Sequence, residues 1–229
     1  GILYYQNSEE NFFVGPSQPW SRDKYSEDTD ALFIDIDNDL DLDLYVASGS
    51  NEWEINSTSY QDRMYINDGN GIFFKNNDIL PEILISTSTV VKSDYDLDGD
   101  MDLFIGARSM PRKYPLSASS VLLENKDGKY VNITDNVAPL LNKIGMVTDA
   151  IWSDINLDGY DDLLVVGEWM TIHVFINENG TKLVDWTSKA GLNEMRGWWR
   201  RIHALDKDND GDTDFIVGNL GLNNKFINH

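Results

Sequence analysis

The chain has 229 residues, of which 41% are hydrophobic and 11% aromatic, so it carries enough apolar material for a substantial core and global disorder is excluded. Its net charge of −21 at pH 7 argues against nucleic acid or anionic lipid as a partner, because a polyanion would be repelled. The chain lacks cysteine, which excludes disulfides and thiolate metal sites, and no 18-residue apolar run predicts a membrane span.

The chain opens with a strand–turn–strand pattern. Residues 3–14 (LYYQNSEENFFV) place two apolar runs on either side of a polar turn, which is typical of a β-hairpin. Clearer copies follow at 63–74, 121–131 and 174–184. Aligning the turn asparagines gives spacings of 60, 58 and 52 residues between Asn7, Asn67, Asn125 and Asn177.

Four acidic segments recur with nearly the same period. They are DIDNDLDLD (35–43), DYDLDGDMD (94–102), DINLDGYDD (154–162) and DKDNDGDTD (206–214), referred to below as the first to fourth acidic loops. Their starts are 59, 60 and 52 residues apart. They hold 19 of the 39 acidic residues of the chain, which favours dedicated cation sites over a diffuse acidic surface. Two independent landmarks with one period indicate a repeat architecture.

Short β-branched or aromatic runs flank every acidic loop, and we predict that they are strands. The runs before the loops are 31–34, 89–93, 150–153 and 202–205, and those after them are 44–48, 103–107, 163–167 and 215–219. One repeat is therefore strand, acidic loop, strand, connection, strand, hairpin turn and strand. Four strands in about 55 residues are typical of one blade of a β-propeller.

We therefore predict an all-β chain, a β-propeller of four-stranded antiparallel blades with the acidic loop between the first two strands of a blade. The predicted units are a half blade at 1–22, blades at 23–80, 81–140 and 141–190, and a half blade at 191–229. They amount to about four blade equivalents. We expect an arc of a larger propeller in a longer chain, and a closed four-bladed ring is the alternative.

Oxygen-bearing side chains recur at positions 1, 3, 5 and 9 of each acidic loop, and a backbone carbonyl is available at position 7. Ca²⁺ takes six to eight such oxygen ligands in flexible geometry. The predicted side-chain ligands are Asp35, Asp37, Asp39, Asp43, Asp94, Asp96, Asp98, Asp102, Asp154, Asn156, Asp158, Asp162, Asp206, Asp208, Asp210 and Asp214. The predicted carbonyl ligands belong to Asp41, Asp100, Tyr160 and Asp212. Up to four Ca²⁺ ions are expected.

Other cation sites fit the pattern less well. Mg²⁺ prefers a tight octahedron with several waters, and Zn²⁺ prefers His or Cys ligands, which the loops lack. An EF-hand requires a bidentate Glu at position 12, where these loops have aliphatic residues, so it is rejected. Position 6 favours a positive φ, and the first loop has Leu40 where the others have glycine. We expect the first site to be the weakest or empty.

The acidic loops with the strings DLFIGAR, DLLVVGEW and DFIVGNLG resemble FG-GAP/VCBS repeats. Longer strings within residues 80–225 resemble the repeat region of ASPIC/UnbV-type (cartilage acidic protein-like) proteins of Bacteroidota. The resemblance covers nearly the whole chain and implies an exported, calcium-bearing β-propeller, commonly of about seven blades. It does not extend to an ASPIC/UnbV segment.

We expect a calcium-stabilised propeller at the cell surface or outside the cell, with outer-membrane association by family analogy. It would be a binding or scaffold module for protein interaction or adhesion, and the partner is a protein or a glycan. Ca²⁺ modules with millimolar-range affinity fill outside cells, which agrees with export.

Two alternatives depend on particular residues. Exposed tryptophans stack on sugars, so Trp53, Trp169, Trp198 and Trp199 suggest a lectin-like propeller, although packing between blades is expected for most of them. A polysaccharide lyase needs a basic catalytic cluster, which the sequence does not present. The three histidines, His173, His203 and His229, are expected to be packed or solvated, and we predict no enzyme.

Overall fold

The computed structural model describes residues 1–221 as a set of antiparallel β-sheets. Two short strands, β1 (Tyr4–Gln6) and β2 (Phe12–Val14), form a hairpin that precedes the 3₁₀ helix η1 (Pro19–Arg22). The first four-stranded sheet has the order β3-β4-β5-β6. Its strands are β3 (Asp28–Ile34), β4 (Asp43–Ser48), β5 (Arg63–Asn67) and β6 (Phe73–Asn76), with η2 (Thr58–Tyr60) between β4 and β5.

The next two repeats follow the same order. The second sheet contains β7 (Thr87–Ser93), β8 (Asp102–Ala107), β9 (Val121–Asn125) and β10 (Tyr130–Asn132). Two short helices, α1 (Thr134–Val137) and η3 (Pro139–Lys143), lead into the third sheet. The third sheet contains β11 (Met146–Ser153), β12 (Asp162–Met170), β13 (His173–Asn177) and β14 (Leu183–Asp185), and β15 (Gly197–Leu205) and β16 (Asp214–Asn219) come last.

The strand and hairpin predictions are confirmed in every repeat, and each acidic loop connects the first two strands of its repeat. The third sheet departs from the separate four-stranded blades that the sequence predicts. Strand β12 continues to Met170, beyond the predicted run 163–167, and its last residues pair with the start of β15 at Glu168↔Trp198 and Met170↔Gly197. The third sheet is therefore continuous with β15 and β16 as one six-stranded sheet.

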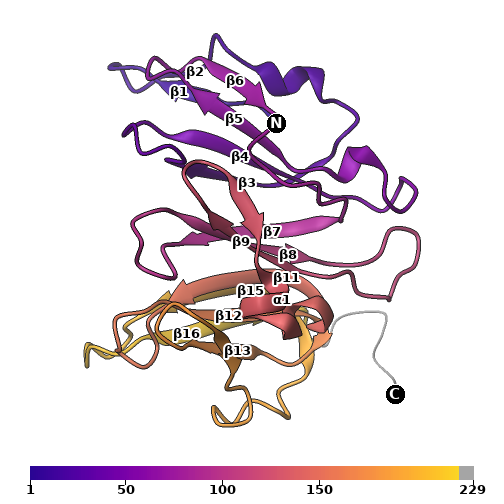
Figure 1. Ribbon diagram of the computed structural model, residues 1–229, viewed down its shortest axis with the longest axis vertical. Coiled ribbons are helices and arrows are strands. Elements are labelled where there is room, and N and C mark those ends of the chain that lie inside the picture. Colours follow the sequence, from indigo (N-terminus) through magenta and orange to yellow (C-terminus); the bar gives the residue numbers. More distant parts are fainter. Residues whose placement is uncertain (222–229) are drawn as a thin grey trace.

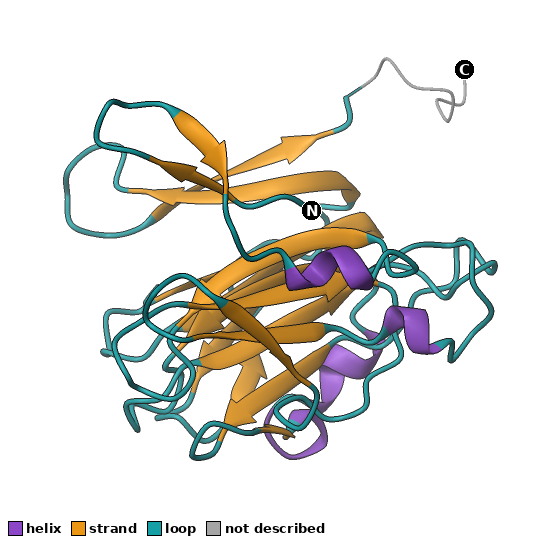
Figure 2. Cartoon of the chain, turned by 90° about the horizontal axis from the view of Figure 1, so that it is seen from above, coloured by secondary structure: helices purple, strands orange, loops and turns teal. Residues whose placement is uncertain are grey.

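The sheets are stacked along the long axis of the molecule, with β1 and β2 near one end and β13 and β16 near the other (Figure 1). The described residues therefore do not close into a four-bladed ring. Strands make up nearly all the regular structure, and the short helices lie in the connections (Figure 2). None of the helices within residues 1–221 is long and apolar enough to cross a membrane.

The first strands of successive repeats lie beside one another, β3 next to β7, β7 next to β11 and β11 next to β15. A hydroxyl near the start of each first strand donates to a backbone carbonyl of the next one. The three bonds are Thr29 Oγ1 to Thr87 O (2.9 Å), Ser88 Oγ to Val147 O (2.7 Å) and Thr148 Oγ1 to Trp199 O (2.9 Å). These bonds fix neighbouring sheets to each other at one end.

The apolar cores lie between the sheets. Ile34, Tyr45 and Met64 of the first sheet form one cluster with Leu103 and Leu123 of the second. A second cluster joins the second and third sheets, and its members include Phe104, Leu122, Val147, Val165 and Phe175. Since burying one such side chain stabilises a fold by about 1.5–3 kcal/mol, each sheet depends on its neighbours for most of its stability.

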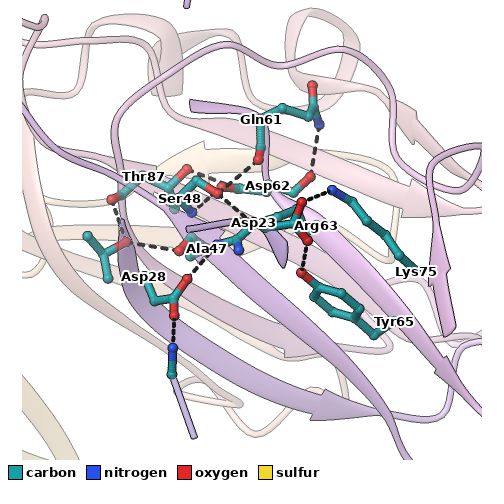
Figure 3. A network of polar contacts seen from close by, with 12 residues as sticks. Asp23, Asp28, Ala47, Ser48, Gln61, Asp62, Arg63, Tyr65, Lys75 and Thr87 are labelled. Carbon is teal, nitrogen blue, oxygen red and sulfur yellow. Dashed lines mark hydrogen bonds and ion pairs between the residues drawn. The ribbon is translucent and has the colours of Figure 1, made fainter. Parts of the chain in front are cut away.

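A buried polar network crosses the start of the first sheet (Figure 3). The Asp62 carboxylate accepts hydrogen bonds from Tyr45 Oη (2.5 Å), Ser48 N (2.6 Å) and Thr87 Oγ1 (2.9 Å), and so joins the first sheet to β7. Burial raises the pKa of Asp62 to about 7, although these three donors and Arg63 act in the opposite direction.

Candidate metal sites in the acidic loops

The four acidic loops share one turn geometry. In each loop the carboxylate at position 1 accepts a hydrogen bond from the backbone N–H at position 6. The pairs are Asp35–Leu40 (3.1 Å), Asp94–Gly99 (3.1 Å), Asp154–Gly159 (2.8 Å) and Asp206–Gly211 (3.2 Å). The loop is thereby wrapped around its first aspartate.

A second contact recurs inside every loop, because the carboxylate at position 5 accepts the N–H at position 7. The pairs are Asp39–Asp41 (3.0 Å), Asp98–Asp100 (3.0 Å), Asp158–Tyr160 (2.9 Å) and Asp210–Asp212 (3.1 Å). Aspartate is suited to such local turns because its side chain bonds the backbone two residues further on. The alternating aspartates therefore shape the loop as well as supply oxygen atoms.

Two positions of each loop have a positive φ. Position 6 was predicted to need this conformation, and it is confirmed at Leu40 (φ 74°) as well as at the three loop glycines. The positive φ at position 4 was not predicted from the sequence. It lies between 58° and 61° in all four loops, at Asn38, Leu97, Leu157 and Asn209. The asparagines were an available signal, since Asn tolerates this region, but the leucines gave none.

The aspartates at position 9 lie beneath the loops. Asp43, Asp102 and Asp162 are buried at the start of the second strand of each sheet. Each accepts the backbone N–H of a hairpin asparagine, in the pairs Asp43–Asn67 (2.8 Å), Asp102–Asn125 (2.8 Å) and Asp162–Asn177 (2.7 Å). Burial raises the pKa of Asp43 to about 6 and that of Asp102 to about 8, and nearby aspartates add to the effect.

Several carboxylate oxygen atoms in the first two loops are buried and receive no hydrogen bond from any described residue. They are Oδ1 of Asp35, Oδ1 of Asp41, Oδ1 of Asp94 and Oδ2 of Asp102. A buried carboxylate without a donor is costly, and buried charges in proteins are paired or coordinate metals. These oxygen atoms therefore fit a cation.

In three of the four loops, three of the four predicted side-chain ligands come together in space, and Asp43, Asp98 and Asp214 are not in these groups. In each group, one oxygen atom from each of three aspartates lies within 4.8 Å of the other two. The groups are Asp35 with Asp37 and Asp39, Asp94 with Asp96 and Asp102, and Asp206 with Asp208 and Asp210. A dense set of hard oxygen donors suits Ca²⁺ rather than Zn²⁺.

The third loop differs in its side-chain contacts. The Asn156 amide donates to Asp158 Oδ2 (2.9 Å), and the two Asp154 oxygen atoms accept the N–H groups of Asp158 (3.0 Å) and Gly159 (2.8 Å). Both Asp206 oxygen atoms of the fourth loop accept N–H groups in the same way. The asparagine at position 3 of the third loop removes one negative charge and supplies the amide that donates to Asp158.

Two hairpin asparagines connect the first and second acidic loops to the following sheet. Asn125 Nδ2 donates to the carbonyl of Ile36 (3.1 Å) in the first loop, and Asn177 Nδ2 donates to the carbonyl of Tyr95 (2.7 Å) in the second. Gly180 lies so close that an added Cβ would be 2.7 Å from the Cα of Asp96. The first two loops are thus part of the contact between neighbouring sheets.

The histidines occupy unremarkable surroundings. His173 is half-buried and stacks on Phe175 with ring centroids 6.0 Å apart, and burial lowers its pKa. His203 is exposed, and His229 lies outside the described residues.

Two of the four tryptophans considered for glycan binding are more exposed than packing between sheets implies. Trp53 is 37% exposed and Trp169 is 48% exposed, whereas Trp198 and Trp199 are half-buried.

Comparison with known proteins gives the family of the chain. The FG-GAP-like repeat model matches three overlapping segments, residues 35–105, 94–165 and 154–217, each running from one acidic loop into the strand after the next. No curated protein matches the sequence.

Among solved structures, the fold is similar to that of the rhamnogalacturonan lyase YesW, with 15% identity and a TM-score of 0.47 over 94% of this chain. The chain spans 42% of that protein, and so distant a likeness carries no argument about function. The family matches together run from residue 35 to residue 217, over more than half of the chain, and the protein belongs to the FG-GAP-like repeat family.

Proposed function

We propose that the protein is a calcium-stabilised β-propeller module that works outside the cell or at its surface, where it binds a partner or serves as a scaffold. The observation that carries this proposal is the set of buried carboxylate oxygen atoms without donors in the first two acidic loops, at Asp35, Asp94 and Asp102. A bound Ca²⁺ would offset both their burial and their mutual repulsion.

The proposed ligands are the side chains at positions 1, 3, 5 and 9 and the carbonyl at position 7 of each loop. The second loop has the most complete set, because its buried Asp102 gathers with Asp94 and Asp96. The first loop gathers Asp35, Asp37 and Asp39 without its buried Asp43 and carries the strained Leu40, and the third loop lacks one carboxylate. We therefore propose that the second site binds Ca²⁺ most tightly.

The ion would stabilise the fold because it binds the native state and not the unfolded chain. Extracellular calcium modules typically bind at about 10⁻⁴–10⁻³ M. At 2 mM Ca²⁺ such a site contributes on the order of 1–2 kcal/mol, so three sites would change the melting temperature by several degrees. Affinities in this range are the reason for proposing an extracellular location and export.

We propose a protein or a glycan at the cell surface as the partner, and we propose no catalytic role. The repeat strings also motivate assignment to the ASPIC/UnbV-type proteins of Bacteroidota and to a propeller larger than the described arc. Both assignments come from sequence resemblance.

The first test measures calcium binding and thermal stability together. The protein is stripped with EDTA, titrated with CaCl₂ by calorimetry, and melted in 2 mM Ca²⁺ and in EDTA. We expect Ca²⁺ to raise the melting temperature, and Mg²⁺ at the same concentration to raise it less. An unchanged melting temperature together with a silent titration would refute the calcium proposal.

A variant of the second loop makes the test specific. Asp94→Asn keeps an oxygen acceptor for the Gly99 N–H but removes the charge, so it should lose stability relative to the parent in Ca²⁺ and match or exceed it in EDTA. Asp78→Asn removes the same charge from an exposed site outside the loops and is the control. A destabilisation of Asp94→Asn that is equal in both buffers would contradict a metal role for this aspartate.

A further inference from the structure

A polar cavity lies at the opposite ends of the strands from the acidic loops. Its volume is 510 Å³, and it opens beside the starts of the first strands. We call it the arginine pocket. It is lined by hydroxyl side chains and guanidinium groups that include Thr29, Ser88, Thr148, Arg108, Arg200 and Arg201. A concentration of arginine is unexpected in a chain with a net charge of −21.

Comparison of the four repeats indicates that the fold does not require Arg200. Each first strand has a β-bulge near its start, and the bulged residues are Thr29, Ser88, Thr148 and Arg200. The first three donate their hydroxyls to the next strand, as described above. In the fourth repeat a long cation replaces the short hydroxyl, and its guanidinium group turns to the pocket.

A buried carboxylate positions two of the guanidinium groups. The Glu168 side chain is fully buried, 2.6 Å from Arg108 Nη2 and 3.6 Å from Arg200 Nη1. Arg108 and Arg200 nevertheless remain 45% and 52% exposed, so each still presents N–H groups to solvent. Arg201 is held by Asp149 at 3.5 Å. Three arginines and two carboxylates leave one positive charge, which matches a monoanion such as a carboxylate.

An aromatic groove lies on the other side of Glu168. This cavity of 620 Å³ is lined by Glu168 and Trp169, and we call it the tryptophan groove. Trp169 sits in a β-bulge with a φ of 59°, a left-handed conformation that is strained for an L-residue, and strain of this kind concentrates at functional sites. The bulge leaves the indole 48% exposed, with its Nε1 donating to Tyr114 Oη (2.9 Å) and its ring 4.8 Å from that of Trp198.

We infer that the arginine pocket and the tryptophan groove form one binding site for an acidic glycan. A uronate carboxylate binds the exposed edges of Arg108 and Arg200, because a planar guanidinium fork matches a carboxylate. The adjoining sugar ring stacks on Trp169, and the hydroxyls of the pocket bond the hydroxyls of the sugar. This inference names the ligand class of the surface module proposed above and rests on that proposal.

The shape and chemistry of the site favour a sugar over an acidic peptide. A concave site with a half-exposed indole and several hydroxyl oxygen atoms that can accept hydrogen bonds suits a ring that has both apolar faces and hydroxyl groups. A single net positive charge suits one carboxylate per binding unit better than a phosphate dianion. The combined volume of the two cavities accommodates more than one sugar unit.

Calorimetry and tryptophan fluorescence test the inference in 2 mM Ca²⁺. The probes are hexasaccharides that contain glucuronate, galacturonate or mannuronate, each paired with its carboxyl-reduced form. We expect at least one uronate probe to bind and to change the tryptophan emission, and its reduced form to bind about tenfold or more weakly, as expected for a lost charge-assisted hydrogen bond. Absence of binding by all three uronate probes would overturn the inference.

Variants assign the binding to this site. Arg200→Ala and Trp169→Gly, which retains a residue suited to the positive φ, should each weaken binding about tenfold. Arg200→Lys keeps the charge and should bind at an intermediate level. Arg22→Ala, an exposed arginine outside both cavities, is the control. Equal binding by an acidic hexapeptide, or equal affinity of all four variants, would also overturn the inference.

The calcium melts described above are repeated on the same variants. Failure of glycan binding with an intact calcium response removes only the glycan site, whereas absence of a calcium response in the parent protein refutes the proposed stabilisation by Ca²⁺.

Discussion

Leu40 is the residue at which the first acidic loop departs from the others, and its backbone adopts the positive φ that they give to glycine. It is 93% exposed, so its side chain contributes little burial. Leu40→Gly should therefore stabilise the protein by about 0.5–1 kcal/mol, because relief of the left-handed strain exceeds the entropy cost of glycine. Urea unfolding measures this difference.

The control for that change lies two residues away. Leu42 is also exposed but has no positive φ, so Leu42→Gly should destabilise the protein by about 0.5–1 kcal/mol. Equal effects of the two glycine substitutions would show that strain at position 6 is not what limits the first loop. Calorimetry on Leu40→Gly should also show tighter Ca²⁺ binding.

Asp62 provides a prediction for the pH dependence of stability. Its pKa is raised to about 7 in the folded protein by burial, whereas an unfolded aspartate titrates near 4. The folded state therefore binds more protons between pH 4 and 7. This contribution to stability is fully present below pH 4, decreases as the pH rises to 7, and is then absent. The difference in pKa corresponds to roughly 4 kcal/mol.

Asp62→Asn removes this titration and keeps one acceptor oxygen for the Ser48 N–H, while its amide NH2 faces the hydroxyls of Tyr45 and Thr87, which can accept. The free energy of unfolding of the parent minus that of the variant should fall by a few kcal/mol between pH 4 and 8, as measured by urea unfolding at each pH. A difference that stays constant with pH would show that the ionisation of Asp62 is not linked to folding.

At the scale of the element, the hairpins provide one of the contacts between neighbouring sheets. Asn125 is buried, donates to the Ile36 carbonyl of the preceding sheet, and accepts the Gly128 N–H (2.9 Å). Asn125→Ala leaves both groups without their partner, which should cost about 2–4 kcal/mol. Asn67→Ala is the matched change in the first sheet, where the amide bonds only within its own sheet.

Denaturant unfolding of these two variants separates contact between sheets from hairpin geometry. Asn125→Ala should lose clearly more stability than Asn67→Ala, since only Asn125 spans two sheets. If the losses are equal, the hairpin turn itself accounts for them and the bridge to Ile36 contributes nothing measurable.

At the scale of the whole molecule, the acidic loops and the sheet contacts are parts of one structure. Gly180 of the third sheet approaches Asp96 of the second acidic loop, and an added methyl group would collide with its backbone. Gly180→Ala should therefore reduce stability and also weaken the calcium response, although it alters no proposed ligand. Melting in Ca²⁺ and in EDTA measures both effects.

Gly191 supplies a close control for that substitution. Its φ of 74° is near the 70° of Gly180, but no heavy atom lies within 4 Å of an added Cβ. Gly191→Ala should thus show the backbone strain of about 1 kcal/mol alone, with an undiminished calcium response. An equal calcium response in both variants would show that the loop and the next hairpin are uncoupled.

Much of this architecture was predictable because two landmarks recur with one period. The acidic loops and the hairpin asparagines placed the strand pairs within each repeat, and the alternating aspartates identified the three groups that come together. The contact from Asn125 to Ile36 was not predictable, since its partner lies 89 residues away in the chain. The extension of β12 to Met170 also depends on pairing with β15, a tertiary contact that no local pattern encodes.

Neighbouring sheets are fastened near both ends of their strands, by hydroxyl bonds such as that of Ser88 at one end and by asparagine amides such as that of Asn177 at the other. Two separated attachment points prevent one sheet from pivoting on the next. A ligand that contacts two sheets therefore binds a rigid surface, and little entropy is lost in ordering the protein. Its affinity depends on its own fit to that surface rather than on adjustment of the protein.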